Sequence, residues 1–243
     1  MCFTINVNIV KEEMERRFNA NLLDPEEYRP SYYYSAFSFP KIPVIPAESA
    51  DEIHQYHWGL IPSWSKDKEF ASSIRTKTGN AKAETLTQKP SFRGSVQSKR
   101  CLVITRGFYE WQKRNNESIP YYIYLKDDSI FALAGLYDSW KNPESGEIHN
   151  TFSIITTKAN SLLAKIHNTK KRMPVILTKD NESKWLDQEQ PVTNVLKLLK
   201  PYQYDNLQAH AISKRNVGKN VPELIEPYDY NAPLNLIVLQ NGK

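Results

Sequence analysis

The sequence predicts an α+β fold, a single domain in which mainly antiparallel strands form a curved or barrel-like sheet with short flanking helices. Three observations indicate this class. Strand-like runs follow one another directly, short polar turns join them, and no long helices alternate with them as in a doubly wound parallel sheet. The 243 residues are 40% hydrophobic and 12% aromatic, which is enough to bury a large core.

The first third of the chain is predicted to contain strands interrupted by prolines. Residues 3–10 alternate as a strand does, and Met14 and Phe18 lie four apart in an otherwise charged segment, which indicates a short amphipathic helix over 11–19. Three further strands are predicted over 32–39, 44–45 and 53–60, separated by Pro40, Pro43 and Pro46. A short helix is expected over 83–88.

The rest of the chain predicts hairpins followed by helices. Strands are expected over 101–111, 121–125, 130–140 and 151–157, with polar turns at 113–116 and 142–146. Helices are expected over 160–167, from Thr178 toward Leu186 and over 192–200, and strands over 173–177, 209–212 and 234–239. We expect one domain over 1–243, with the tail 227–243 packed on it.

Cysteine usage and hydropathy indicate an intracellular protein. Two cysteines occur, and Cys101 lies in an apolar run typical of a buried thiol, which argues against a disulfide framework. Charged residues follow within a dozen positions of the start, and no apolar stretch approaches the ~20 residues that span a bilayer. We therefore predict a cytoplasmic protein, without a membrane partner and monomeric.

Positive charge is concentrated in two stretches. Residues 70–109 contain eight bases and one acid, Glu84, while residues 148–179 contain six bases and no acid. The whole chain carries a net charge of +5. If the two stretches meet in space, they form a positive groove suited to a phosphate backbone. The alternative is a merely solvated basic surface.

A cysteine directly follows the initiator methionine. Methionine is generally removed before a small side chain, so we expect a mature chain that begins at Cys2 with its amine and thiol on adjacent carbons. An α-amino group titrates near ~7.7–8.0 against ~10.4 for lysine, so more of it is neutral and nucleophilic at pH 7. Such an amine forms an imine with an aldehyde, and the thiol then closes a thiazolidine ring. A cysteine placed there by chance is the alternative.

The histidines do not indicate a metal site. His54 and His57, three apart on a predicted strand, point to opposite faces, and no cysteine or carboxylate stands at ligand spacing from His149 or His210. We predict no metal and no cofactor.

Four further motifs, together with Met1-Cys2, resemble the SOS-response-associated peptidase family. They are WGLIPSW at 58–64, NAKAET at 80–85, GFYEW at 107–111, and IHN at 166–168 leading to RMPV at 172–175. The resemblance extends from residue 2 to about Glu226. It implies a DNA-repair factor that recognises abasic sites in single-stranded DNA, links itself to them through Cys2 as a thiazolidine, and is found with the nucleoid when it acts.

The resemblance also implies catalytic roles. It assigns Asn80 to the active site and His167 to sugar-ring opening and the neighbouring sugar-phosphate. The chemistry of Glu110 and His167 is consistent with such roles, because a closed abasic sugar needs a proton donor and a proton acceptor before an amine can attack it. Glu110 follows an apolar run whose burial would raise its pKa. Taken alone, Glu110 is a strand-end surface residue, His167 a capping or packing residue and Asn80 a turn residue.

The resemblance further places DNA contacts. Lys82 and Arg172 stand where the family has phosphate-contacting bases, and Trp64 where it has an aromatic side chain against a base. Arg93, in the first basic stretch, is predicted to contact DNA with them. The chain departs from the family at Phe3 and Thr4, where many members have Gly-Arg. A lysine at 82 also replaces a common arginine and loses its bidentate geometry.

Two other functions stay open. One is a hydrolase in which Cys2 is an N-terminal nucleophile that cuts an amide, including its own Met1-Cys2 bond. The other is a non-catalytic module that binds single-stranded nucleic acid, in which Cys2 plays no part.

Overall fold

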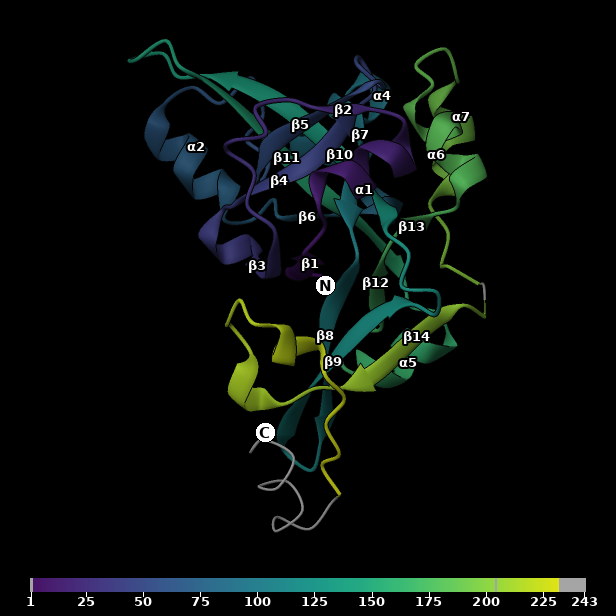
Figure 1. The fold of residues 1–243 in the computed structure, drawn as a ribbon. Helices are drawn as coiled ribbons and strands as arrows, with labels where there is room; N and C mark the ends of the chain where they lie inside the picture. Colours follow the sequence, from purple (N-terminus) through teal and green to yellow (C-terminus); the bar gives the residue numbers. More distant parts are fainter. Residues whose placement is uncertain (1, 204, 232–243) are drawn as a thin grey trace.

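Five strands close into a barrel, which is the larger part of the structure (Figure 1). The computed structural model describes residues 2–203 and 205–231. The barrel strands are β4 (Lys41–Pro46), β5 (Glu52–Trp58), β7 (Arg100–Thr105), β10 (Phe131–Lys141) and β11 (Ile148–Lys158). Their neighbours are antiparallel except at the closure, where β11 pairs in parallel with β5 at Thr151 and His57. The predicted barrel-like sheet is confirmed.

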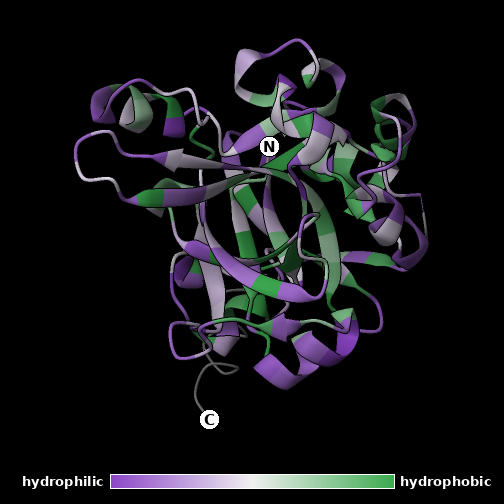
Figure 2. Ribbon diagram, turned by 90° about the horizontal axis from the view of Figure 1, so that it is seen from above, coloured by the Kyte–Doolittle hydropathy of each residue, from purple (hydrophilic) through white to green (hydrophobic). Residues whose placement is uncertain are grey.

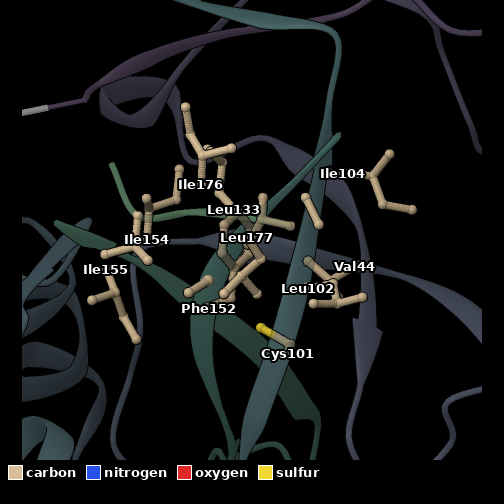
Figure 3. Close-up of a cluster of buried hydrophobic side chains, with 14 of the residues drawn as sticks. Val44, Cys101, Leu102, Ile104, Leu133, Phe152, Ile154, Ile155, Ile176 and Leu177 are labelled. Atoms are coloured by element: carbon tan, nitrogen blue, oxygen red, sulfur yellow. The ribbon is translucent and has the colours of Figure 1, made fainter. Parts of the chain in front are cut away.

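The barrel interior holds the main hydrophobic core (Figure 3). Val44, Cys101, Leu133 and Phe152 are all fully buried within it. Gly135 permits the close approach of β10 to β7, since a Cβ there would lie 2.8 Å from the Cys101 sulfur. Cys101 is thus the buried free thiol that the sequence indicates.

Four short strands extend the barrel sheet. They are β2 (Asn21–Leu22), β6 (Asn80–Lys82), β12 (Arg172–Pro174) and β13 (Ile176–Leu177). β6 pairs in parallel with β11, and β12 pairs antiparallel with the end of the same strand. β11 therefore carries on its two sides the segments that contain Asn80 and Arg172.

A second sheet of five strands lies beside the barrel (Figure 1). Its order is β14 (Leu207–Ala211), β9 (Glu117–Leu125), β8 (Gly107–Arg114), β1 (Thr4–Val7) and β3 (Ser31–Ser35). The chain passes from barrel to sheet at Arg106, between β7 and β8. The adjacent Gly107 is required there, because a Cβ would lie 2.5 Å from the Tyr122 ring.

Short helices surround the two sheets. They are α1 (Lys11–Phe18), α2 (Lys68–Arg75), α3 (Pro90–Arg93), α4 (Ser95–Ser98), α5 (Ser161–Ile166), α6 (Lys179–Leu186), α7 (Val192–Val195) and the 3₁₀ helices η1 (Ala36–Ser38), η2 (Ala83–Thr85), η3 (Leu196–Leu198), η4 (Lys214–Asn216) and η5 (Pro222–Ile225). In Figure 2 hydrophilic residues are frequent in the peripheral helices and loops, and hydrophobic residues are frequent in the central strands. No helix within the described ranges is both long and apolar enough to cross a membrane.

Several predicted boundaries were wrong. Pro43 and Pro46 lie in β4 rather than between strands. Pro43 is paired only with β5 and Pro46 only with β7, so each proline lies where one edge of β4 has no partner. The predicted strand over 101–111 is two strands, β7 and β8. The predicted strand over 173–177 is likewise divided between β12 and β13. Helix α2 was not predicted, although Asp67 caps it by accepting from the Phe70 N–H.

The tail is only partly described. Tyr228 donates its N–H to the Ala211 carbonyl, and the Tyr230 hydroxyl donates to the Ile212 carbonyl, both at 2.8 Å. The predicted strand 234–239 lies outside the described residues.

Candidate active site at the start of the chain

Strand register brings Cys2 toward Glu110. β1 runs antiparallel to β8, with Ile5 opposite Phe108 and Asn6 opposite Gly107. Continuing this register leads the segment before Thr4 alongside the residues that follow Phe108. Cys2 is fully buried there, so the start of the described chain is part of the core rather than a free end.

The Cys2 thiol is held in its neutral form. Burial raises its pKa far above the ordinary value, and the negative charge of Glu110 raises it further. The sulfur lies 3.8 Å from the Thr4 carbonyl oxygen, to which the thiol donates. A neutral thiol is a weak nucleophile, so this environment does not favour the thiolate that begins cysteine hydrolysis.

Asn80 holds the backbone of Cys2. Its Nδ2 donates to the Cys2 carbonyl at 2.8 Å, across 78 residues of sequence. The buried Trp58 fixes the preceding residue, because its Nε1 donates to the Gly79 carbonyl at 2.8 Å. Among the described residues, no donor reaches the buried Oδ1 of Asn80. This oxygen is therefore available to accept a hydrogen bond from a substrate.

Glu110 is a buried carboxyl group with a strongly shifted pKa. It is 3% exposed, and burial raises its pKa from 4.5 to about 7. Desolvation has this effect because it penalises the charged carboxylate more than the neutral acid. Glu110 can therefore donate or accept a proton near neutral pH, as its predicted role requires.

His167 faces Glu110 from the end of helix α5. Its Nδ1 lies 3.7 Å from the Glu110 Oε1 and 3.0 Å from the Arg172 carbonyl oxygen. Since a carbonyl can only accept, Nδ1 carries the proton, and the neutral ring presents a lone pair at Nε2. Burial lowers the His167 pKa and so favours this neutral form.

The loop that follows His167 is tied to strand β8. Asn168 accepts from the Lys113 N–H at 3.0 Å through Oδ1 and donates to the Lys113 carbonyl at 2.8 Å through Nδ2. Gln112 adds a bond from Nε2 to the Lys165 carbonyl at 3.0 Å. These bonds fix the helix end that carries His167 against the strand that carries Glu110.

Arg172 is paired within the protein. Its guanidinium donates to both Glu84 oxygens, at 2.6 and 2.9 Å, and to the Thr156 carbonyl at 2.6 Å. The side chain thus crosses β11 to join β12 to the segment after β6. This arrangement connects the elements that carry Asn80 and His167. The pairing was not foreseen, although Glu84 is conspicuous as the single acid among eight bases in 70–109.

The other predicted DNA contacts lie outside this buried cluster. Trp64, on the loop between β5 and α2, is 52% exposed and packs 5.6 Å from the Phe70 ring. Lys82 is exposed at the end of β6, and Arg93 is exposed at the end of α3. Lys82 is therefore near Asn80 in the fold, whereas Arg93 adjoins helix α4.

The two basic stretches meet, but many of their charges are used internally. The stretches 70–109 and 148–179 are in direct contact, because β6 of the first pairs with β11 of the second. Arg100 is fully buried and donates to four backbone carbonyls, and Arg106 pairs with Glu13 and Asp128. Lys99 pairs with Asp138. The charge available for a phosphate backbone is thus smaller than the sequence count indicates.

Within the described ranges, no group of three or more His, Cys, Asp and Glu residues could hold a metal ion. The cluster brings together a thiol, an amide, a carboxyl group and an imidazole.

Fold and site together define an α+β barrel protein with a buried cysteine at position 2 beside a carboxyl–imidazole pair. The chain belongs to the SOS response associated peptidase (SRAP) family, whose profile matches residues 1–220.

Individual relatives agree with this assignment. The chain is 40% identical to the abasic site processing protein YoqW of Bacillus subtilis over 94% of this chain and 100% of that protein. It is 32% identical to the abasic site processing protein HMCES of Gallus gallus, over 96% of this chain and 76% of that one. A crystal structure of a Bacteroides thetaiotaomicron protein, 39% identical, superimposes with a TM-score of 0.89 over 94% of this chain and 100% of that chain.

Proposed function

We propose that this protein processes abasic sites in single-stranded DNA and, after removal of Met1, captures them covalently through Cys2 as a thiazolidine, which shields the lesion. Membership of the family and the names of the relatives support abasic-site processing. The observation that carries the proposal is the convergence of Cys2, Asn80, Glu110 and His167 on one buried cluster.

Ring opening is the first step. The abasic sugar exists mostly as a closed hemiacetal, so a proton must leave the C1′ hydroxyl while another reaches the ring oxygen. His167 accepts through Nε2, and Glu110, protonated up to about pH 7, donates. The product is a free aldehyde at C1′.

Amine attack precedes thiol attack. The free α-amine of Cys2 adds to C1′, and loss of one water gives an imine. The thiol then adds to the imine carbon, its proton passes to the nitrogen, and a thiazolidine closes. The order follows from the environment of Cys2, because its thiol is held neutral by burial and by the charge of Glu110. Asn80 holds the Cys2 carbonyl and offers Oδ1 to the sugar or imine.

The hydrolase alternative requires a Cys2 thiol whose pKa is lowered rather than raised. A cysteine nucleophile that cuts an amide needs a thiolate, and burial disfavours this thiolate strongly. The binding-module alternative gives no account of a buried carboxyl group and imidazole beside Cys2.

Incubation with an abasic single-stranded oligonucleotide tests the proposal. We expect an adduct that survives denaturing electrophoresis, and none with a tetrahydrofuran analogue, which has no aldehyde. Cys2→Ala should abolish the adduct, and Cys101→Ala, the matched control in the barrel core, should retain it. Absence of an adduct with the unaltered protein would refute the proposal.

A further inference from the structure

Two phenylalanines form a stacked pair next to Cys2. Phe3 follows Cys2 directly, and its ring stacks on that of Phe37 with centroids 5.0 Å apart and planes inclined by 29°. Phe37, in η1, is 73% exposed, the largest exposed fraction among the exposed large hydrophobic side chains of the described residues. A ring this exposed adds little to folding through burial.

The backbone holds this pair in place beside the site. The Ala36 N–H donates to the Phe3 carbonyl at 2.9 Å, so η1 is tied to the residue after Cys2. The Ser35 hydroxyl accepts from the Phe37 N–H and caps η1. On the other side, Phe3 covers Gly79, where a Cβ would lie 3.8 Å from its ring. Phe3 therefore lies against the residue that precedes Asn80.

We propose that Phe3 and Phe37 form a platform on which the nucleobase adjacent to the abasic site stacks. This inference depends on the proposed function. An abasic site removes one base from the stack, so its neighbour loses the partner on one face. An exposed phenyl ring beside the capturing residue supplies that partner, and base–aromatic stacking is strong enough to matter for single-stranded binding. Because larger bases overlap a phenyl ring more fully, a flanking purine is preferred.

Phe37→Leu isolates the stacking contribution, because leucine keeps the apolar character and removes the aromatic face. Capture rates are measured against the concentration of an oligonucleotide with one abasic site. The flanking residue is a purine or a tetrahydrofuran spacer. The unaltered protein should reach half-maximal capture at a lower concentration of the oligonucleotide with the purine flank. Phe37→Leu should raise this concentration about tenfold for the purine flank and leave it unchanged for the spacer. Phe37→Trp should restore the preference, and Ile148→Ala, an exposed apolar control, should not change it.

A second measurement separates failure of the platform from failure of covalent capture. Cys2→Ala protein is mixed with an oligonucleotide that carries 2-aminopurine beside the abasic site, and its fluorescence reports stacking without any covalent step. We expect quenching that is lost in Cys2→Ala/Phe37→Leu. Equal fluorescence in both proteins, or no dependence of the unaltered protein on the flanking base, would overturn the platform. An altered sedimentation coefficient of Phe37→Leu without a change in base preference would instead indicate a surface between copies of the chain, and would equally overturn it.

Discussion

The Nδ1 atom of His167 lies 3.7 Å from the Oε1 atom of Glu110, although 57 residues separate the two in sequence. Nδ1 also donates to the Arg172 carbonyl at 3.0 Å, which fixes the tautomer of the ring. Burial shifts the two pKa values in opposite directions, up for Glu110 and down for His167. Near neutral pH the pair thus comprises a carboxyl group that still carries its proton in part and a neutral imidazole. Such a pair can both supply and accept a proton in the proposed ring opening.

Glu110→Gln should slow capture strongly while leaving DNA binding intact. Glutamine keeps the shape but can neither donate an acidic proton nor accept one, and loss of a general acid–base typically costs ~10²–10⁴-fold in rate. Single-turnover adduct formation on denaturing gels measures the effect. Glu117→Gln, which removes an exposed carboxylate paired with Lys214, is the matched control and should react normally. A Glu110→Gln rate within twofold of the unaltered protein would remove Glu110 from the mechanism.

The raised pKa of Glu110 also predicts a pH-dependent stability. Its pKa in the folded protein, about 7, exceeds the ordinary 4.5, so the folded state holds the proton more tightly. The resulting stabilisation is complete below pH 4.5, is lost as pH rises to about 7, and stays lost above it. The shift corresponds to about 3 kcal/mol. Urea unfolding of Glu110→Gln and the unaltered protein should therefore diverge over this window, with the variant gaining relative stability. If the unfolding free energies of the two proteins change with pH in parallel, burial does not raise the pKa of Glu110.

Asn80→Asp should impair the positioning of Cys2. The substitution keeps the shape and replaces the Nδ2 donor by an oxygen that faces the Cys2 carbonyl. Loss of this bond with an acceptor left unpaired costs ~1–3 kcal/mol, so we expect the capture rate to fall by about tenfold or more. The control is Asn216→Asp, because Asn216 likewise donates its amide to a backbone carbonyl, that of Glu223, but on an exposed segment. Equal effects of the two substitutions would indicate a general loss of stability.

Glu84→Gln should increase the salt dependence of DNA binding. The Glu84 carboxylate neutralises Arg172 through two hydrogen bonds, and its removal leaves the full guanidinium charge near the site. One more phosphate contact changes the slope of log K against log salt by ~0.7 for single strands. Titrations of Cys2→Ala/Glu84→Gln at several salt concentrations measure it. An unchanged slope would show that Arg172 does not face the DNA backbone.

Much of the fold was predictable because local patterns govern it. The hairpin turns at 113–116 and 142–146 and helix α1 are where polar turns and the spacing of Met14 and Phe18 predict them. Closure of the barrel was not predictable, because it depends on the parallel pairing of Thr151 with His57, about a hundred residues apart. Local patterns carry no information on such a contact.

The members of the candidate site were predictable from the sequence, but the residues that hold them in place were not. Motif order led to Cys2, Asn80, Glu110 and His167, whereas the residues that hold them act through tertiary contacts. Asn168 braces the His167 loop on Lys113, and Trp58 holds Gly79. Charge counting also overstated the basic surface, because a sequence does not reveal that Arg100 is buried among carbonyls.

In the proposed mechanism the amine and thiol of Cys2 together capture a sugar aldehyde. Intact-mass spectrometry of the reaction with an abasic oligonucleotide tests it most directly. We predict a species with the mass of the chain without Met1 plus the oligonucleotide minus one water, and digestion should place the link at Cys2. An adduct that retains Met1, or one attached at a lysine, would refute capture through Cys2.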